Sequence, residues 1–187
     1  MKINKVILFF LFTMSLSCYG QKEKTNSETR KFIDNADFTQ VNRDWNISAK
    51  FSSGIGELVS FFPVEAIDLK TNQKVKSLQM DMTVNIAGKG YSYFKSSWID
   101  LNEVEEFIYF LEQYIIPNLN DKTESRQSVT YIFNSKEITF TFYITQLSKK
   151  ISIYLKDNGI IDDEHYFWTE TQVNKIPNLL AVLKQIK

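Results

Sequence analysis

The sequence predicts an α+β fold, a mainly antiparallel β-sheet of about six to eight strands with two amphipathic helices packed against it. Alternation of apolar and polar residues is strictest in residues 75–86 and returns in residues 137–144. Two other stretches, near residues 101–115 and 175–186, carry apolar residues at helical spacing. Period-two alternation is typical of strands with one buried face, whereas spacings of three and four are typical of amphipathic helices.

Length and composition fit one folded domain with appendages. The chain has 187 residues, of which 43% are hydrophobic and 14% aromatic, and its formal net charge is zero. We divide it into a signal peptide at residues 1–20, a polar tether at 21–43 and a single α+β domain at 44–187. Because nucleic-acid binding needs a basic face and Lys and Arg form no long blocks, nucleic acid is not an expected partner.

The N-terminus has the features of an export signal. Lys2 and Lys5 precede an apolar run at residues 6–12, which is too short for a membrane-spanning helix. Two cleavage sites remain open. Cleavage after Gly20 would give a soluble periplasmic or extracellular protein, whereas cleavage before Cys18, the one cysteine, would give a lipoprotein anchored to the membrane through that residue.

Two segments resemble other proteins. The run Cys-Tyr-Gly-Gln at residues 18–21 resembles the signal ends of small exported proteins from Bacteroidetes. The run Trp-Ile-Asp-Leu-Asn-Glu at residues 98–103, with the sheet and helix after it, resembles small exported domains of unknown function. This resemblance covers the last half of the chain and implies export, but it brings no known active residues.

The first strands are predicted after the tether. Residues 21–30 are polar and lack periodicity, and residues 31–43 are ambiguous but fit a short helical turn around Phe32 and Ile33. Alternation begins at Trp45 and ends at a Gly-containing break at 52–56. Residues 57–62 and 64–70 follow as two separate strands, because Pro63 cannot donate a hydrogen bond within a central strand.

Residues 75–86 and 91–99 are predicted to form a hairpin with its turn at the glycines of 88–90. A helix follows. Asp100 is its expected N-cap, and Glu103 is placed to accept a hydrogen bond from the cap's backbone N–H. Pro117 ends this helix, because the residue before a proline disfavours helical geometry.

The second half repeats this order. Strands are predicted at residues 128–134, 137–144 and 149–156, followed by an Asn-Gly turn at 158–159 and a short strand at 165–168. A helix starting near Lys175, capped by Asn174, closes the chain. The similarity of the halves fits either a duplicated βββα unit or two ordinary helices that share a period.

No catalytic residue, metal site or cofactor is predicted. His165, the one histidine, lies in an acidic stretch and is interpreted as a solvated loop residue, because a catalytic triad needs further parts. The oxygen donors of residues 157–164 do not have the spacing of a calcium loop. Glu105 and Glu112 fit a solvated helix flank better than a catalytic pair.

The remaining candidate site is a recognition surface. Aromatic residues lie among Thr and Ser on the predicted solvated faces: Tyr93 (or Tyr91), Trp98, Tyr143 and Tyr154. Such a face binds a protein or a glycan of the cell envelope, unless helices cover it and make the rings core. The sequence therefore favours a non-catalytic binding or accessory module. The alternatives are an envelope hydrolase whose site forms only in the fold, and an inhibitor-type interaction protein.

Overall fold

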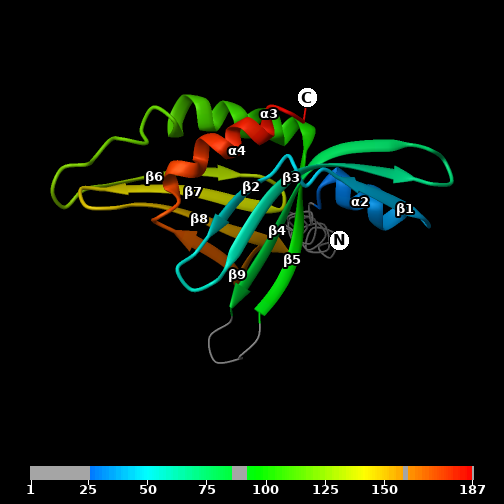
Figure 1. Ribbon diagram of the computed structural model, residues 1–187, viewed down its shortest axis with the longest axis horizontal. Helices are drawn as coiled ribbons and strands as arrows, with labels where there is room; N and C mark the ends of the chain where they lie inside the picture. The colour runs from blue at the N-terminus through cyan, green and yellow to red at the C-terminus, as the bar shows by residue number, and fades with distance from the viewer. Residues whose placement is uncertain (1–25, 86–91, 158–159, 187) are drawn as a thin grey trace, which may run out of the picture.

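The computed structural model describes residues 26–85, 92–157 and 160–186, without the side chains of 162–164. The predicted signal segment, Cys18, both cleavage sites and the two glycine turns therefore lie outside the described residues. Within those residues, nine strands form two antiparallel sheets, and helices pack against them (Figure 1). The predicted α+β class is confirmed, although the strands divide into two sheets rather than forming one.

The first sheet, sheet A, holds the N-terminal strands. They are β1 (Thr39–Arg43), β2 (Ala49–Ser52), β3 (Leu58–Asp68), β4 (Lys74–Asn85) and β5 (Ser92–Asp100). Their order is β1-β3-β4-β5, and β2 also pairs with β3. Because β3 and β4 are long, their connecting turn extends from the rest of the molecule as an arm, with β1 beside it (Figure 1).

The prediction of two strands separated by Pro63 is wrong, since β3 continues through this residue. The reason lies in the pairing. On one side, Pro63 pairs with Leu78 of β4; on the other side, β2 pairs with residues 58–61 and β1 with residues 64–68. The missing N–H of Pro63 therefore falls where the strand changes partners, a position that leaves the ladder intact.

The second sheet, sheet B, is a meander in chain order. Its strands are β6 (Ser128–Asn134), β7 (Ile138–Thr145), β8 (Lys149–Asp157) and β9 (Ile160–Thr169). The first three agree with the prediction. The last strand is longer than predicted, because the acidic residues before His165 continue the strand instead of forming a loop.

The two sheets and two helices share one core. Helix α3 (Leu101–Phe110) continues as a π-helical segment, η2 (Leu111–Ile115), and the 3-10 turn η3 (Val173–Lys175) leads into α4 (Ile176–Leu183). Asn174 therefore lies inside η3 and is not the predicted cap. Side chains from β2 to β5, from all strands of sheet B and from both helices form a single hydrophobic cluster.

The predicted polar tether is wrong from Ser27 onward. Helix α2 (Glu28–Asn35) and β1 are both part of the folded structure. The helix packs on the face of sheet A that points away from the main core. There it covers a smaller hydrophobic cluster, whose members are Phe62, Val64 and Trp98 with Ile33 and Val41 packed against them. Residues 27–43, which the prediction assigned to the tether, are therefore part of the folded structure.

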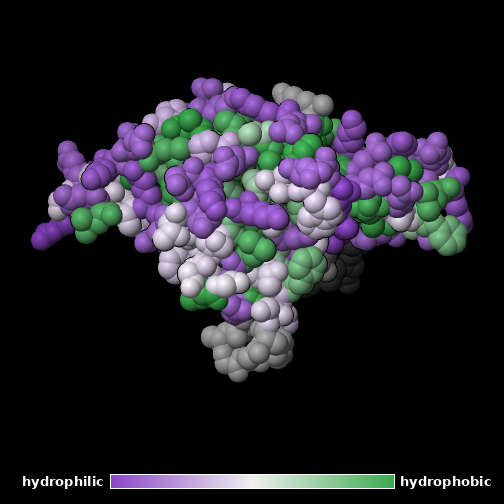
Figure 2. All heavy atoms as spheres, viewed as in Figure 1, coloured by the Kyte–Doolittle hydropathy of each residue, from purple (hydrophilic) through white to green (hydrophobic). Residues whose placement is uncertain are grey.

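The viewed surface of the molecule is mostly hydrophilic (Figure 2). Hydrophobic atoms gather at the end of the arm, where Phe38 and Leu69 are exposed. Lys70 Nζ lies 5.4 Å from the centre of the Phe38 ring. The α2–β1 connection and the β3–β4 turn therefore contact each other at this tip. Among the helices of the described residues, none is long and apolar enough to cross a membrane.

Candidate functional site

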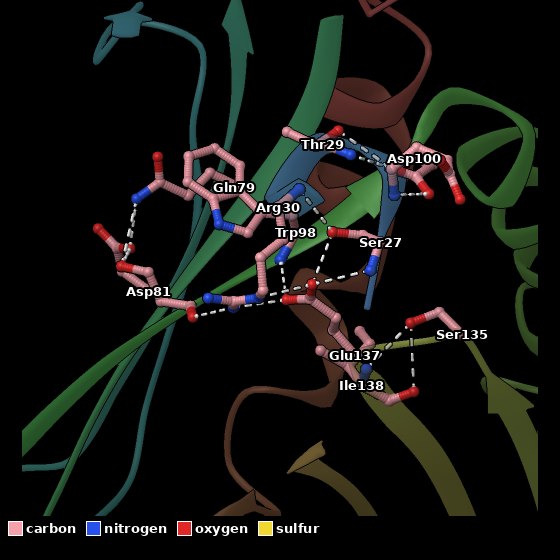
Figure 3. Close-up of polar contacts among 12 residues, drawn as sticks. Ser27, Thr29, Arg30, Gln79, Asp81, Trp98, Asp100, Ser135, Glu137 and Ile138 are labelled. Atoms are coloured by element: carbon pink, nitrogen blue, oxygen red, sulfur yellow. Dashed lines mark hydrogen bonds and ion pairs between the residues drawn. The ribbon is translucent and has the colours of Figure 1, made fainter. Parts of the chain in front are cut away.

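A cluster of paired polar groups lies where α2, the end of β5 and the β6–β7 turn meet (Figure 3). We call this cluster the polar clamp. Its members are Ser27, Thr29, Arg30, Asp100, Glu103, Lys136 and Glu137. It is the first of two candidate sites, because it gathers three carboxyl groups in the interior.

Glu137 is the centre of the clamp and is almost fully buried. Its Oε1 accepts hydrogen bonds from the Ser27 hydroxyl (2.6 Å), the Ser27 N–H (3.1 Å) and the Arg30 Nε (2.8 Å). Its Oε2 accepts bonds from the Arg30 Nη2 (2.7 Å) and the Trp98 backbone N–H (3.0 Å). The hydrogen bonds to Glu137 raise the pKa of Arg30, as expected for a guanidinium held by both carboxylate oxygens.

Asp100 holds the start of α2. Its carboxylate accepts hydrogen bonds from the backbone N–H groups of Glu28 (2.8 Å) and Thr29 (3.0 Å), and from Lys136 Nζ (3.0 Å). The first N–H groups of a helix have no partner inside the helix, and the helix dipole favours negative charge there. Burial alone would raise the pKa of Asp100, but these bonds outweigh burial and lower the pKa below its ordinary value.

Glu103 shows the opposite balance. Its Oε2 accepts the Asp100 N–H (3.1 Å), as the capping pattern predicts, and its Oε1 accepts the Lys136 N–H (2.7 Å). Burial raises the pKa of Glu103, because the two backbone bonds only partly offset desolvation. A raised carboxyl pKa is also a feature of catalytic acids. Here both oxygens are bonded to backbone donors, so Glu103 joins α3 to the β6–β7 turn.

The second candidate is the surface of sheet B that faces away from the core. We call it the outer face, and its residues are Thr130, Ile132, Asn134, Thr139, Thr141, Tyr143, Lys150, Ser152, Tyr154, Lys156, Tyr166 and Trp168. The residues that alternate with them, such as Phe140 and Ile153, belong to the core. Within the described residues, α3 and α4 pack on the core side and α2 packs on sheet A, so no helix covers the outer face.

The aromatic rings of the outer face are held by one another and by a lysine. Lys150 Nζ lies 5.6 Å from the ring centre of Tyr143 and 5.7 Å from that of Trp168, which is cation–π geometry. Tyr154 and Tyr166 stack with ring centres 4.5 Å apart. Because neighbours already orient these side chains, a partner that binds them orders fewer free rotamers.

The four aromatic residues predicted for a solvated face divide between three places. Tyr143 and Tyr154 lie on the outer face of sheet B and are half-buried. The prediction for Trp98 is wrong: it is only 7% exposed and belongs to the cluster under α2. Tyr93 points to the core side of sheet A, where its ring meets His165 edge-on at 6.2 Å.

His165 corrects a second prediction. It lies in β9 and is buried, so it is not a solvated loop residue. Its position follows from alternation, because Phe167 and Thr169 point to the same side and are also buried. Tyr166 and Trp168, which alternate with them, complete the outer face. The alternation of His165, Phe167 and Thr169 with Tyr166 and Trp168 is the signal in the sequence that indicates this arrangement.

Neither metal motifs nor known proteins identify a function. In the part of the chain that the structure describes, no three His, Cys, Asp or Glu residues lie together in a way that could hold a metal ion. No protein-family model matches the chain, and neither a curated protein nor a solved structure matches it significantly. The outer face and the polar clamp are therefore interpreted from their own geometry.

Proposed function

We propose that this chain is an exported accessory module of the cell envelope, non-catalytic, that binds a partner protein through the outer face of sheet B. The observation that carries the proposal is a row of oriented aromatic rings on a sheet face that no described helix covers. The polar clamp is structural in this proposal, because it holds α2 and the two sheets together.

The composition of the outer face favours a protein partner. Tyr and Trp are the residue types that contribute most to protein interfaces, and Trp168 is 45% exposed. Ile132 adds an exposed apolar side chain on the same face. Among the side chains that the structure describes, the charged groups of the outer face are Lys150 and Lys156, so a partner with acidic groups around an apolar centre would complement them.

A glycan is the second candidate for the same face. The Thr141 hydroxyl lies on the same face as the rings, and the Tyr166 hydroxyl is 3.3 Å from that of Ser152, which is itself buried. Hydroxyls beside aromatic rings offer both the polar and the apolar contacts that a sugar ring uses. A protein and a glycan differ in size and in chemistry, so one capture experiment distinguishes the two candidates.

Export rests on the N-terminal sequence. Lys2 and Lys5, the short apolar run after them, and the small residues up to Gly20 support a cleaved signal. A binding module without a catalytic motif fits the cell envelope, where the protein would be either free or anchored through Cys18.

The test is photo-cross-linking in the cells that make the protein. A photoreactive phenylalanine analogue replaces Thr141 on the outer face or, as the control, Tyr109, which is exposed on α3. We expect an adduct from position 141 and none from position 109. Adding W168A should reduce the yield of the adduct from position 141 by at least about thirtyfold, which is the effect of losing one interface hot spot. The intact mass of the captured chain also shows whether it begins after Gly20 or at a lipidated Cys18.

Each result decides between the candidates. An adduct digested by protease supports the protein partner, and one that resists protease but is cleaved by glycosidases supports the glycan. Equal adducts from both positions, or no effect of W168A, would show that the outer face is not the binding surface. A captured chain that retains residues 1–17 would contradict export by a cleaved signal.

A further inference from the structure

Strand β6 forms one edge of sheet B, and its outer backbone edge is unpaired. In the described residues, no hydrogen bond joins this edge of residues 128–134 to another segment. The strand, Ser-Val-Thr-Tyr-Ile-Phe-Asn, has seven residues and contains no charge, proline or glycine. Val129 and Ile132 are 41% and 55% exposed. Proteins usually protect edge strands with charges, prolines or covering segments, because unpaired edges bind other strands.

Strand β5, one edge of sheet A, shows what protection looks like. The polar clamp occupies two of its outer backbone groups. Arg30 Nη2 donates to the Ser96 carbonyl (3.1 Å), and the Trp98 N–H donates to Glu137 (3.0 Å). The chain therefore protects the β5 edge with buried charges, whereas the described residues leave the β6 edge ready to accept a strand.

We propose that β6 is a dimerisation edge, which pairs in antiparallel register with β6 of a second copy of this chain. The strand is complementary to itself when the twofold axis passes through Tyr131. Thr130 then lies opposite Ile132 of the second copy, and Val129 opposite Phe133, so both exposed apolar side chains gain a neighbour on their own face. Since β6 has no charge, no like charges meet across the axis.

The two four-stranded sheets would thereby become one sheet of eight strands. Their outer faces would be continuous, and each would contribute the same row of rings. This inference is independent of the proposed function, since dimerisation is measured on the purified protein alone. If the protein is a monomer, the dimer proposal fails but the outer face can still bind a partner. If it is a dimer that binds no partner, the proposed function fails but the assignment of β6 as the dimer edge still holds.

Sedimentation velocity over a concentration series tests the proposal. We expect a dimer for the wild-type chain. The double variant T130K/I132K should be a monomer, with dimerisation weakened at least thirtyfold, because the register brings the introduced charges together. The variant T130E/I132E should be monomeric for the same reason. An equimolar mixture of the two variants should form a dimer, since unlike charges then lie opposite each other.

The control variant Q146K/L147K adds the same charge in the exposed β7–β8 turn and should remain dimeric. Circular dichroism establishes that each variant is folded, and the acidic pair provides the test independently if the basic pair is not. A wild-type chain that stays monomeric at all concentrations overturns the proposal. So does a T130K/I132K variant that dimerises like the wild type, and a variant mixture that stays monomeric overturns the register.

Discussion

The two sheets carry aromatic residues on the sides that face away from the shared core, but with opposite results. On sheet A, Phe62 and Trp98 are buried beneath α2. On sheet B, Tyr154 and Trp168 lie on a face that no described helix covers. Alternation within a strand decides only which side a residue points to. Whether that side becomes core or surface depends on a covering segment from elsewhere in the chain.

Trp98 and Trp168 give the largest expected difference in stability. W98A should lower the free energy of unfolding by about 3–5 kcal/mol, because it removes a buried ring from the cluster under α2. W168A should change it by less than about 1 kcal/mol, because the ring is half-exposed. Urea unfolding of both variants measures the contrast. A small effect of W98A would mean that α2 does not cover sheet A in solution.

The next largest change in stability is expected in the polar clamp. E137Q keeps the shape of the side chain but leaves the Arg30 guanidinium and several donors without a charged partner. We expect a loss of about 2–3 kcal/mol in unfolding free energy. The matched control is E112Q, which removes an exposed ion pair with Lys184 and should cost at most about 1 kcal/mol. Equal losses in thermal or urea unfolding would contradict the central role of Glu137.

Asp100 should make stability depend on pH. Its pKa is lowered in the folded state, so its contribution is present above the ordinary aspartate pKa of about 3.9 and is lost as the pH falls through the lower folded value. D100N should therefore cost about 1–2 kcal/mol at pH 7, and its difference from wild type should shrink towards pH 3. Urea unfolding at several pH values measures this change. A difference that stays constant with pH would rule out the charge of Asp100 as its cause.

Glu103 is the internal control, because its shift has the opposite sign. Its pKa is raised, so its ionised form is unfavourable in the folded state above the ordinary glutamate pKa. The free energy of unfolding of E103Q should therefore rise relative to that of the wild type as the pH increases from about 4 to 7. The substitution also removes one acceptor for a backbone N–H, which lowers stability at every pH. The net effect at pH 7 should be smaller than that of D100N.

Local patterns predicted most of the fold. Alternation located β4, β6, β7 and β8, and the helical stripes located α3 and α4. The same alternation placed Tyr143 and Tyr154 on the side of sheet B that faces away from the core. These features depend on residues close together in the chain, so a single sequence contains the information that determines them.

Features that depend on distant partners were not predicted. The segment around α2 is polar, and the groups that fix it, Asp100 and Glu137, lie far along the chain. Without that contact the segment has too few apolar residues to indicate more than a short helical turn around Phe32 and Ile33, or that this turn belongs to a helix packed on a sheet. The error for Trp98 follows from the error for α2, because the missing helix is what buries the ring.

The clamp also sets the order in which the chain can fold. Ser27 and its acceptor Glu137 are 110 positions apart, and Thr29 and Asp100 are 71 apart. A ribosome releases the N-terminal segment first, so the docking site of α2 stays incomplete until the β6–β7 hairpin, which carries Glu137, has emerged. Contacts of such sequence separation slow folding. Helix α2 would therefore be among the last elements to reach all of its native contacts.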